Sequence, residues 1–348
     1  MTSRPRIAHV MAGAANGGAE LFFERLTMAQ SADGLDILPV IRRNTERRAR
    51  LESGGLHPQE LSFGGRLDLL TRPRLRKALK HFKPDVTVAW MNRAARFTPV
   101  GDWTLVGRLG GFYDLSYYRH CQHLVGNTRG IVKWLQQEGW PEERAHYVPN
   151  FAADLSSVPP SRPADIPRNA PFILALGRLH RNKAFDVLIR ALAKLPGVWL
   201  LIAGEGPERA NLEELARREG VADRLLMPGW ADPAPLIREC DVLVCPSRHE
   251  PLGNVVIEGF SAGTAVVAAA SQGPTELITS GNNGLLAPVE DADALAACIH
   301  EVLENPDMKK KFSLSGRHSW ESEYAPACVL RAWEQFLHSV SPNHGNIV

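Results

Sequence analysis

Four charged side chains in the carboxy-terminal half have types and spacing that suit an anionic or polyhydroxyl ligand. Arg178 and Lys183 stand five positions apart, directly after a short apolar run. Two long cations on one loop can converge on a single diphosphate, Arg as a planar fork and Lys as a point charge. Glu250 and Glu258 stand eight positions apart where a loop runs into a helical pattern. Such carboxylates can accept hydrogen bonds from two parts of one ligand. Singly, each residue is equally well explained as a solvated loop charge or a helix-end charge.

Glycine-rich turns supply further candidate contacts. The turn 13–20 contains adjacent Gly17 and Gly18 before a helical pattern, and the turn 203–207 contains Gly204. Glycine lets backbone amides approach a ligand closely, and a helix N-terminus favours an anion. The spacing is not that of the dinucleotide-binding fingerprint. Each turn has an equally ordinary explanation as a tight turn without a ligand.

Short apolar runs alternate with longer amphipathic segments along the whole chain, a pattern typical of parallel-sheet α/β folds. The expected strands are 7–11, 37–41, 86–90, 105–108, 124–126, 172–176, 198–203, 225–227, 242–245 and 265–268. The expected helices are 19–30, 72–81, 129–138, 186–195, 208–219, 234–240, 254–262 and 292–304. Ligands of such sheets bind beyond the carboxyl ends of the strands, which is where the candidate residues fall.

A proline-rich stretch separates two such α/β halves. Five prolines fall within residues 158–171, which is linker composition. A chain of 348 residues is long enough for two hydrophobic cores. We therefore predict two Rossmann-like domains with an interdomain cleft, over 1–163 and 164–325, followed by a C-terminal helix and tail over 326–348 that can pack back on the first domain.

The formal net charge of +2 hides an uneven distribution. Residues 1–163 hold 23 Lys and Arg against 15 Asp and Glu, so this half is basic and the remainder is acidic. Such a face can meet an anionic membrane surface or a phosphorylated acceptor, or it can be solvated surface alone. Nucleic acid is excluded as a partner because no helix-turn-helix, zinc-finger or stacking signature accompanies the charge. The basic residues concentrate in two groups: Arg42, Arg43, Arg47, Arg48 and Arg50, and then Arg66, Arg72, Arg74, Arg76, Lys77, Lys80 and Lys83.

Other classes of site and location find little support. The five cysteines are scattered and include no Cys-x-x-Cys, which argues against a disulfide framework and a zinc site. We expect no metal at the site. No apolar run reaches the length of a membrane span, and the N-terminus carries no signal segment. The sequence therefore predicts a cytoplasmic protein, which the basic half could hold peripherally at the inner face of the membrane.

Taken in order, these motifs resemble the donor-binding domain of the retaining glycosyltransferases of family four, which have the two-domain GT-B fold. The first half is similar more loosely, through Gly17-Gly18-Ala19-Glu20, Gly126-Asn127-Thr128 and Val148-Pro149-Asn150. In the second half the matching stretches are Gly177-Arg178-Leu179 with Lys183, Gly204-Glu205-Gly206-Pro207, Met227-Pro228-Gly229, Glu250 through Glu258, 263–267, Gly273 with Glu276, and 281–288.

The resemblance implies a metal-independent, hexosyltransferase-type enzyme that moves a sugar from a nucleotide diphosphate sugar to a glycan or glycolipid acceptor, in surface polysaccharide or lipopolysaccharide synthesis. The donor is then a co-substrate, and no other cofactor is implied. By the same resemblance, catalytic roles fall to Glu250, Arg178 and Lys183, and donor binding to Gly17, Gly18, Gly204, Trp230, Leu252, Gly253, Asn254 and Glu258.

Three departures from the family pattern leave parts of this interpretation open. The stretch 106–111 has no histidine where many members carry one, so acceptor activation is unassigned and Asn92, Arg93 and Arg108 are the candidates. Leu252 stands where phenylalanine is usual and Phe151 where glycine often stands, which leaves the donor sugar open. A sugar-nucleotide epimerase or hydrolase on the same fold, and a binding protein without turnover, remain alternatives.

Overall fold

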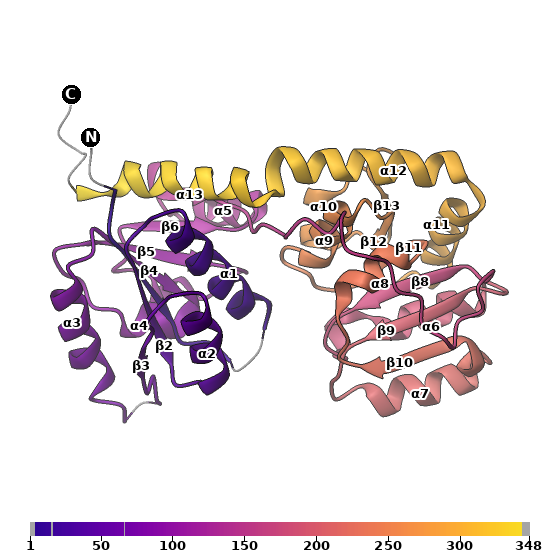
Figure 1. The fold of residues 1–348 in the computed structure, drawn as a ribbon, viewed down its shortest axis with the longest axis horizontal. Helices are drawn as coiled ribbons and strands as arrows, with labels where there is room; N and C mark the ends of the chain where they lie inside the picture. Colours follow the sequence, from indigo (N-terminus) through magenta and orange to yellow (C-terminus); the bar gives the residue numbers. More distant parts are fainter. Residues whose placement is uncertain (1–3, 15–16, 66, 343–348) are drawn as a thin grey trace. The chain divides into compact units, whose positions relative to one another are not determined.

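The chain folds into two compact α/β units. The structure is a computed structural model that describes residues 4–14, 17–65 and 67–342. The first unit comprises Met1–Asn150 with Val329–Val348, and the second comprises Phe151–Cys328. Each unit holds a parallel sheet with helices on both faces (Figure 1), so the predicted pair of Rossmann-like domains is confirmed.

The described part of the first unit contains a seven-stranded sheet in the order β3-β2-β1-β4-β5-β6-β7. All of its neighbouring strands are parallel. Because β1 lies between β2 and β4, the order reverses at β1/β4, and the loops after these two strands diverge there. Its strands are β1 (Ile7–Met11), β2 (Ile37–Arg42), β3 (Gln59–Leu61), β4 (Val86–Trp90), β5 (Thr104–Leu109), β6 (His123–Gly126) and β7 (Ala145–Tyr147).

The helices of the first unit include one from the far end of the sequence. They are α1 (Gly18–Ala32), α2 (Thr45–Ser53), α3 (Thr71–Phe82), α4 (Met91–Phe97), α5 (Arg129–Gln137) and most of α13 (Pro326–Val340), with short 3₁₀ turns at Leu115–Tyr117 and Glu142–Arg144. Trp333 of α13 is fully buried, and the Phe336 ring lies 4.8 Å from that of His146. The hydroxyl of Thr104 donates to the carbonyl of Val340 at 2.7 Å. The end of the chain thus completes the core of the first unit.

The second unit contains a six-stranded parallel sheet in the order β10-β9-β8-β11-β12-β13. Its order reverses at β8/β11. The strands are β8 (Phe172–Leu176), β9 (Trp199–Ala203), β10 (Leu225–Gly229), β11 (Val242–Cys245), β12 (Val266–Ala269) and β13 (Leu285–Ala287). The helices are α6 (Phe185–Ala193), α7 (Arg209–Arg218), α8 (Pro233–Glu239), α9 (Asn254–Ala262), α10 (Gln272–Leu277), α11 (Ala292–Glu304) and α12 (Pro306–Ser319), with 3₁₀ turns at Arg181–Lys183 and Ala222–Arg224 and a π turn at Trp320–Tyr324.

The segment 151–171, which includes the proline-rich stretch, lies against the second unit. The amide of Ala152 donates to the carbonyl of Tyr324 at 3.3 Å, and the Trp320 indole donates to the carbonyl of Ala152 at 3.1 Å. Arg162 pairs with Glu239 at 3.2 Å. The units therefore divide after residues 150 and 328, where the composition had suggested 163 and 325. Over the described residues, no helix has both the length and the apolar character that a membrane span requires.

Candidate functional site

Lys183 and Glu250 meet beyond the carboxyl ends of β8 and β11, the two strands at which the order of the second sheet reverses. The ammonium of Lys183 donates to Oε2 of Glu250, and the hydroxyl of Ser247 donates to the same oxygen at 3.2 Å. The two side chains are 26% and 15% exposed, so the ion pair is shielded from solvent without being sealed. A cation and a carboxylate thus stand together where open α/β sheets bind ligands.

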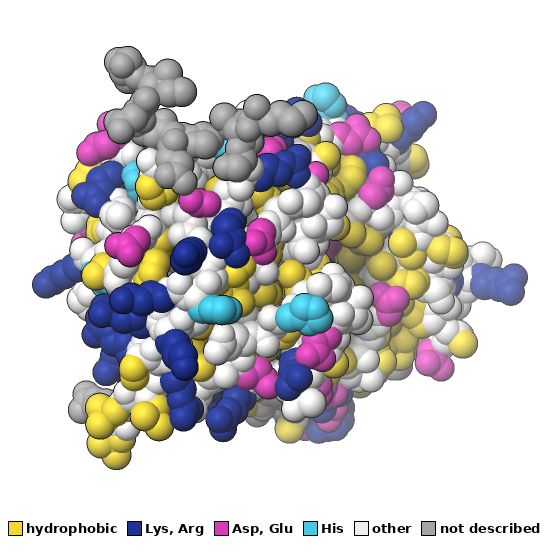
Figure 2. Space-filling model, turned by 60° about the vertical axis from the view of Figure 1, so that its left-hand side comes forward, with side chains coloured by type: hydrophobic (Ala, Val, Ile, Leu, Met, Phe, Trp, Pro, Cys, Tyr) yellow, Lys and Arg dark blue, Asp and Glu magenta, His cyan; other side chains and the backbone are white. Residues whose placement is uncertain are grey.

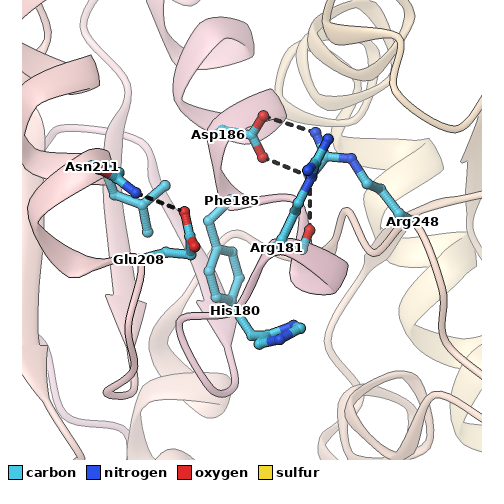
Figure 3. Close-up of a pocket in the computed structure, with 8 residues that line it drawn as sticks. His180, Arg181, Phe185, Asp186, Glu208, Asn211 and Arg248 are labelled. Carbon is cyan, nitrogen blue, oxygen red and sulfur yellow. Dashed lines mark hydrogen bonds and ion pairs between the residues drawn. The ribbon is translucent and has the colours of Figure 1, made fainter.

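A second ion pair joins α6, which begins two residues after Lys183, to the loop that carries Glu250 (Figure 3). The guanidinium of Arg248 donates two hydrogen bonds to the carboxylate of Asp186, both at 2.8 Å. It also donates to the carbonyl of Arg181 at 2.7 Å, and its backbone amide donates to the carbonyl of Asn182 at 2.9 Å. Bidentate pairing of an arginine with a carboxylate constrains the relative orientation of the two side chains and also strengthens their interaction. Arg248 therefore ties the loop after β11 to the 3₁₀ turn that presents Lys183.

The charge of Lys183 is set by its carboxylate neighbours. Burial alone would lower the pKa of this ammonium, but the charges of Glu250 and Glu258 and the hydrogen bond to Glu250 raise it above its usual value. Lys183 is therefore protonated at neutral pH. Because Glu258 contributes to this pKa, it lies within electrostatic reach of the pair, on α9 and half-buried.

Arg178 is arranged differently from the other three charged candidates. Its side chain is exposed and forms no hydrogen bond or ion pair with any residue that the structure describes. It follows β8 directly, and its backbone nitrogen is 3.6 Å from the point where a Cβ on Gly204 would stand. The second unit thus brings Lys183, Glu250 and Glu258 into one neighbourhood and leaves Arg178 as an exposed cation at the end of β8.

Gly204 and Gly177 have a structural reason to be glycine. A Cβ on Gly204 would stand 1.9 Å from the carbonyl oxygen of Gly177, which no side chain tolerates. A Cβ on Gly177 would stand 3.2 Å from Cε of Lys183, so the lysine stem runs over that glycine. Because these two residues have no side chain, the backbone ends of β8 and β9 are in contact, and the aliphatic part of Lys183 packs over Gly177. Donor binding by Gly204 stays a prediction.

The loop before α9 presents backbone rather than side chains. Leu252 is 5% exposed, and its side chain packs in the core. Gly253 has a φ of 90°, a conformation that favours glycine, and α9 begins at Asn254 as the sequence predicted. Trp230, directly after β10, is 69% exposed, so its ring is available for stacking. The predicted roles of these four residues are untested.

In the first unit, the glycine-rich turn after β1 lies against the side-chain carboxylate of Glu20. The amide of Ala14 donates to Oε1 of Glu20 at 2.7 Å. A Cβ on Gly17 would stand 2.4 Å from Oε2 of Glu20, and one on Gly13 would stand 2.1 Å from Oε1. Glu20 is buried. Residues 15–16 of this turn lie outside the described residues, and Gly18 begins α1. Sequence reasoning did not assign Glu20 a part in the site, although an acidic residue in a first helical turn is a usual complement to the helix dipole.

The three candidate acceptor residues differ in burial. Asn92 on α4 accepts a hydrogen bond from the Tyr118 hydroxyl at 2.9 Å, and the charge of Arg108 also acts on Tyr118, so both adjoin one side chain. Arg108, on β5, is 1% exposed. Arg93 is exposed. The first sheet therefore places Asn92 and Arg108 near each other and leaves Arg93 at the surface.

Only part of the first basic group is neutralised by carboxylates: Arg42 and Arg43 are exposed and form no ion pair with a described residue. Arg47 is 1% exposed and pairs with Glu24 at 2.9 Å, and Arg50 pairs with the same carboxylate at 2.6 Å. Arg48 pairs with Glu52 at 2.8 Å. One arginine of this group, Arg47, is thus part of the interior, because the carboxylate of Glu24 neutralises it there.

The second basic group is exposed. Arg72, Arg74, Arg76, Lys77 and Lys80 are all exposed on α3 and form no ion pair with a described residue, whereas Arg66 lies outside the described residues.

A cavity of about 320 Å³ lies on the second unit beside the Arg248–Asp186 pair. His180, Phe185 and Glu208 are among its lining residues (Figure 3), while Lys183 and Glu250 do not line it. Within the described ranges, no group of three His, Cys, Asp or Glu side chains could hold a metal ion.

Comparison with known proteins gives a consistent result. The model of the family described as "Glycosyl transferases group 1" matches residues 161–319. The lipopolysaccharide core biosynthesis glycosyltransferase LpsE of Rhizobium meliloti is 34% identical over 330 residues, which cover 93% of this chain and 96% of LpsE.

Solved structures resemble the whole chain. A glycosyltransferase from Rickettsia africae has a TM-score of 0.86 at 18% identity, covering 98% of this chain and 99% of that one. HepE from Anabaena, solved with UDP and glucose, has a TM-score of 0.82 at 20% identity, covering 96% of this chain and 100% of HepE. At these identities the structural likeness establishes the fold.

Proposed function

Because the chain belongs to the group 1 glycosyltransferases, we propose that it transfers a sugar, with retention of anomeric configuration, from a nucleoside diphosphate sugar to a glycan or glycolipid acceptor of the lipopolysaccharide core. The relationship to LpsE supports the acceptor class, since it runs over nearly the full length of both chains. The UDP bound in HepE supports a nucleoside diphosphate as donor.

The contact between Lys183 and Glu250 is the observation on which the proposal rests. It joins a protonated ammonium and a carboxylate at the switch point of the second sheet, with Glu258 within electrostatic reach. The ammonium can pair with the oxygens of a diphosphate, and the carboxylates can accept hydrogen bonds from sugar hydroxyls. The diphosphate and the sugars of a sugar nucleotide are therefore both matched by groups at this site. In this assignment Glu250 binds the transferred sugar and Glu258 the ribose.

Transfer breaks the bond between the anomeric carbon and a diphosphate oxygen and forms one to an acceptor hydroxyl. Negative charge develops on the leaving diphosphate, where Lys183 and the exposed Arg178 stabilise it electrostatically. The departing phosphate oxygen takes the acceptor proton on the same face of the sugar, which gives retention. In this proposal the backbone of Leu252, Gly253 and Asn254 contacts the sugar beside Glu250.

The alternatives are less well supported. An epimerase or hydrolase of sugar nucleotides needs no acceptor, whereas the relatives are named for transfer. Product analysis with and without an added glycan separates these activities. A binding protein without turnover would release no nucleotide under either condition.

The direct test is a thermal-shift screen with UDP, GDP, ADP and their sugars, on the full chain and on Lys183→Ala. A ligand present at a hundred times its Kd adds about 2.7 kcal/mol to the free energy of unfolding, so the nucleotide that binds is recognised by the rise in melting temperature. We expect one base to stabilise the wild type and the shift to shrink in the variant. An unchanged melting temperature with all three bases would refute the proposed donor site.

We further propose that the enzyme works at the anionic inner face of the cytoplasmic membrane, docked through α3. Leu67, Leu69 and Leu70, just before α3, are 94%, 81% and 59% exposed. In Figure 2, dark-blue Lys and Arg side chains gather beside a group of yellow hydrophobic side chains on the side that α3 occupies. Leucines that insert among lipids next to cations that meet headgroups are typical of interfacial binding. Each basic residue near such a surface contributes roughly 1 kcal/mol.

A further inference from the structure

Three hydrogen-bond donors lie around the position that a Cβ on Gly110 would take, at the carboxyl edge of the first sheet. If Gly110 carried a Cβ, the three nearest described atoms would be Nη1 of Arg108 at 3.1 Å, the Tyr113 hydroxyl at 3.8 Å and Nδ2 of Asn127 at 3.9 Å. Arg108 comes from β5 and Asn127 directly follows β6. All three groups can donate, and the residue between them has no side chain.

Arg108 carries a buried charge with no carboxylate partner among the described residues. Its guanidinium donates to the side-chain oxygen of Asn150 and, at 3.3 Å, to the carbonyl of Leu109, while its Nε has no hydrogen-bond partner in the described part of the chain. Trp90 and Phe22 present their rings to it at 4.8 and 5.4 Å. A buried charge without a counter-ion is costly, and cation–π contacts offset only part of that cost.

Asn127 is also incompletely satisfied. Its Oδ1 has no hydrogen-bond partner over the ranges that the structure describes, although the residue is only 3% exposed. Buried polar atoms without partners are uncommon in native proteins, and each requires an explanation. Gly110 and Tyr113 are only partly buried, so the cluster has residues at the surface as well as the buried Arg108 and Asn127.

We propose that this cluster binds an anionic substituent, a phosphate or a carboxylate, on the sugar acceptor. The anion would accept from Arg108, Tyr113 and Nδ2 of Asn127, and a neighbouring sugar hydroxyl would donate to Oδ1 of Asn127. The ligand would thus neutralise the buried cation and supply a partner for Oδ1 of Asn127. The identity of this ligand as the acceptor rests on the proposed function, whereas the anion site itself does not.

The protonation states at neutral pH suit this ligand. Burial lowers the pKa of Arg108 to about 10, which still leaves the guanidinium charged. Burial raises the pKa of Tyr113, with the charge of Arg108 opposing that shift, so the phenol keeps its proton and can donate. Glu20, whose charge also acts on Tyr113, accepts from the amide of Ala14 and forms no ion pair with Arg108.

The test measures binding of glucose 6-phosphate, glucuronate and glucose to the full chain by calorimetry at constant ionic strength. We expect at least one anionic sugar to bind and glucose not to bind at the same concentration. Preference for glucose 6-phosphate would identify the substituent as a phosphate, and preference for glucuronate would identify a carboxylate. Failure of both to bind more tightly than glucose would overturn the proposal.

Two variants localise the binding without removing the buried cation. Tyr113→Phe deletes one donor and should weaken the anionic sugar about ten-fold, the scale of a hydrogen bond to a charged group. Gly110→Ala fills the space and should abolish binding. Tyr117→Phe, which removes a half-buried phenol hydroxyl, and Gly65→Ala, which meets nothing within 4 Å, are the matched controls.

Nucleotide-induced thermal shifts are recorded on the same samples. A normal nucleotide shift in Tyr113→Phe and Gly110→Ala shows that both fold. If both variants then bind the anionic sugar as the wild type does, the site is elsewhere and the proposal is wrong. If no nucleotide binds the wild type while the anionic sugar does, the proposed donor site fails and the anion site stands.

Discussion

Glu250 accepts a hydrogen bond from the ammonium of Lys183, 67 positions earlier in the chain. The pair joins the loops of adjacent strands, and Arg248 with Asp186 joins the same loops a short distance away. The protein's own carboxylate therefore compensates the lysine charge and orients its side chain. A diphosphate that replaces this partner meets a lysine that needs little further ordering, which reduces the entropic cost of binding.

Loss of the Lys183 ammonium should impair turnover more than loss of another paired lysine of the same unit. We expect Lys183→Ala to lower kcat/KM for sugar transfer by about 1.5–3 kcal/mol in free-energy terms, because a charge-assisted hydrogen bond to the diphosphate is lost. Lys194, which pairs with Asp293 at 2.7 Å on the surface, is the control. Initial rates over a range of donor concentrations measure the effect. Equal rates for Lys183→Ala and Lys194→Ala would contradict the prediction.

A methyl group at position 204 should destabilise the second unit. The Cβ would overlap the carbonyl of Gly177, so β8 and β9 must separate at their carboxyl ends. We expect Gly204→Ala to cost about 1–3 kcal/mol, as overpacking does. Gly220→Ala shares a positive φ but meets nothing within 4 Å, so it isolates the backbone strain. The unfolding midpoints in urea should fall further for Gly204→Ala, and similar midpoints would count against the packing argument.

Glu24 should matter more for stability than either arginine that it binds. Glu24→Gln leaves the buried Arg47 without its carboxylate, which costs about 3–5 kcal/mol by the usual measure of a broken buried pair. Arg47→Met costs less because Glu24 keeps Arg50. Thermal unfolding of the two variants measures the difference. The reverse order of stability would show that Arg50 does not compensate Glu24.

Acid should destabilise the first unit through His9. Trp90 donates to Nδ1 of this ring at 3.1 Å, Nε2 contacts Oε1 of Gln30 at 2.9 Å, and burial lowers the pKa of His9 from 6.5 to about 4. Between these two values the unfolded chain binds the proton and the folded chain does not. Stability is therefore present above pH 6.5 and is lost as the pH falls toward 4, at roughly 1.4 kcal/mol per pH unit.

The His9→Gln variant isolates this contribution. Because other histidines also titrate in this range, the readout is the slope of unfolding free energy against pH, wild type minus variant. The variant's slope should be shallower between pH 6.5 and 4. Parallel slopes would assign the acid sensitivity to other groups.

Membrane docking predicts a salt-sensitive affinity for anionic vesicles. Reversing the charges of Arg72, Arg74, Arg76 and Lys77 should release the protein from phosphatidylglycerol vesicles in sedimentation, and replacing the leucines at 67, 69 and 70 by serine should weaken binding that persists in salt. Charge reversal of Arg217 and Arg218 on α7 is the control. If the α3 variant sediments as the wild type does, α3 is solvated surface.

The sequence predicted the strands that are buried on both faces and the helices with a clear apolar stripe. Val86–Trp90 and Val242–Cys245 have the predicted bounds because a continuous apolar run leaves little choice. Shorter elements were missed, and so was the 14-residue helix α12. In Gln59–Leu61 only the leucine is buried, and Gln272–Leu277 contains glycine and proline in a single helical turn and a half. Such segments are held by their neighbours rather than by their own composition.

The site was predictable by position but not by pairing. Lys183 and Glu250 could be singled out because both follow strands, yet their contact depends on a clamp between Asp186 and Arg248 that no local pattern reveals. The burial of Arg108 had no sequence signal, since arginine is ordinarily exposed. Only the packing of the sheet shows that this residue is interior.

The return of α13 to the first unit affects how that unit can be made. Trp333, Leu337 and the carbonyl of Val340 fill places in a core whose other members were synthesised before residue 150. The ribosome must therefore synthesise the entire second unit before the core of the first unit can be completed. Until then, the apolar surface of the first unit that α13 covers is exposed. A stop codon just before α13 would therefore leave the core of the first unit incomplete, although that unit is encoded at the other end of the gene. The core of the second unit, which directly precedes α13, would remain intact.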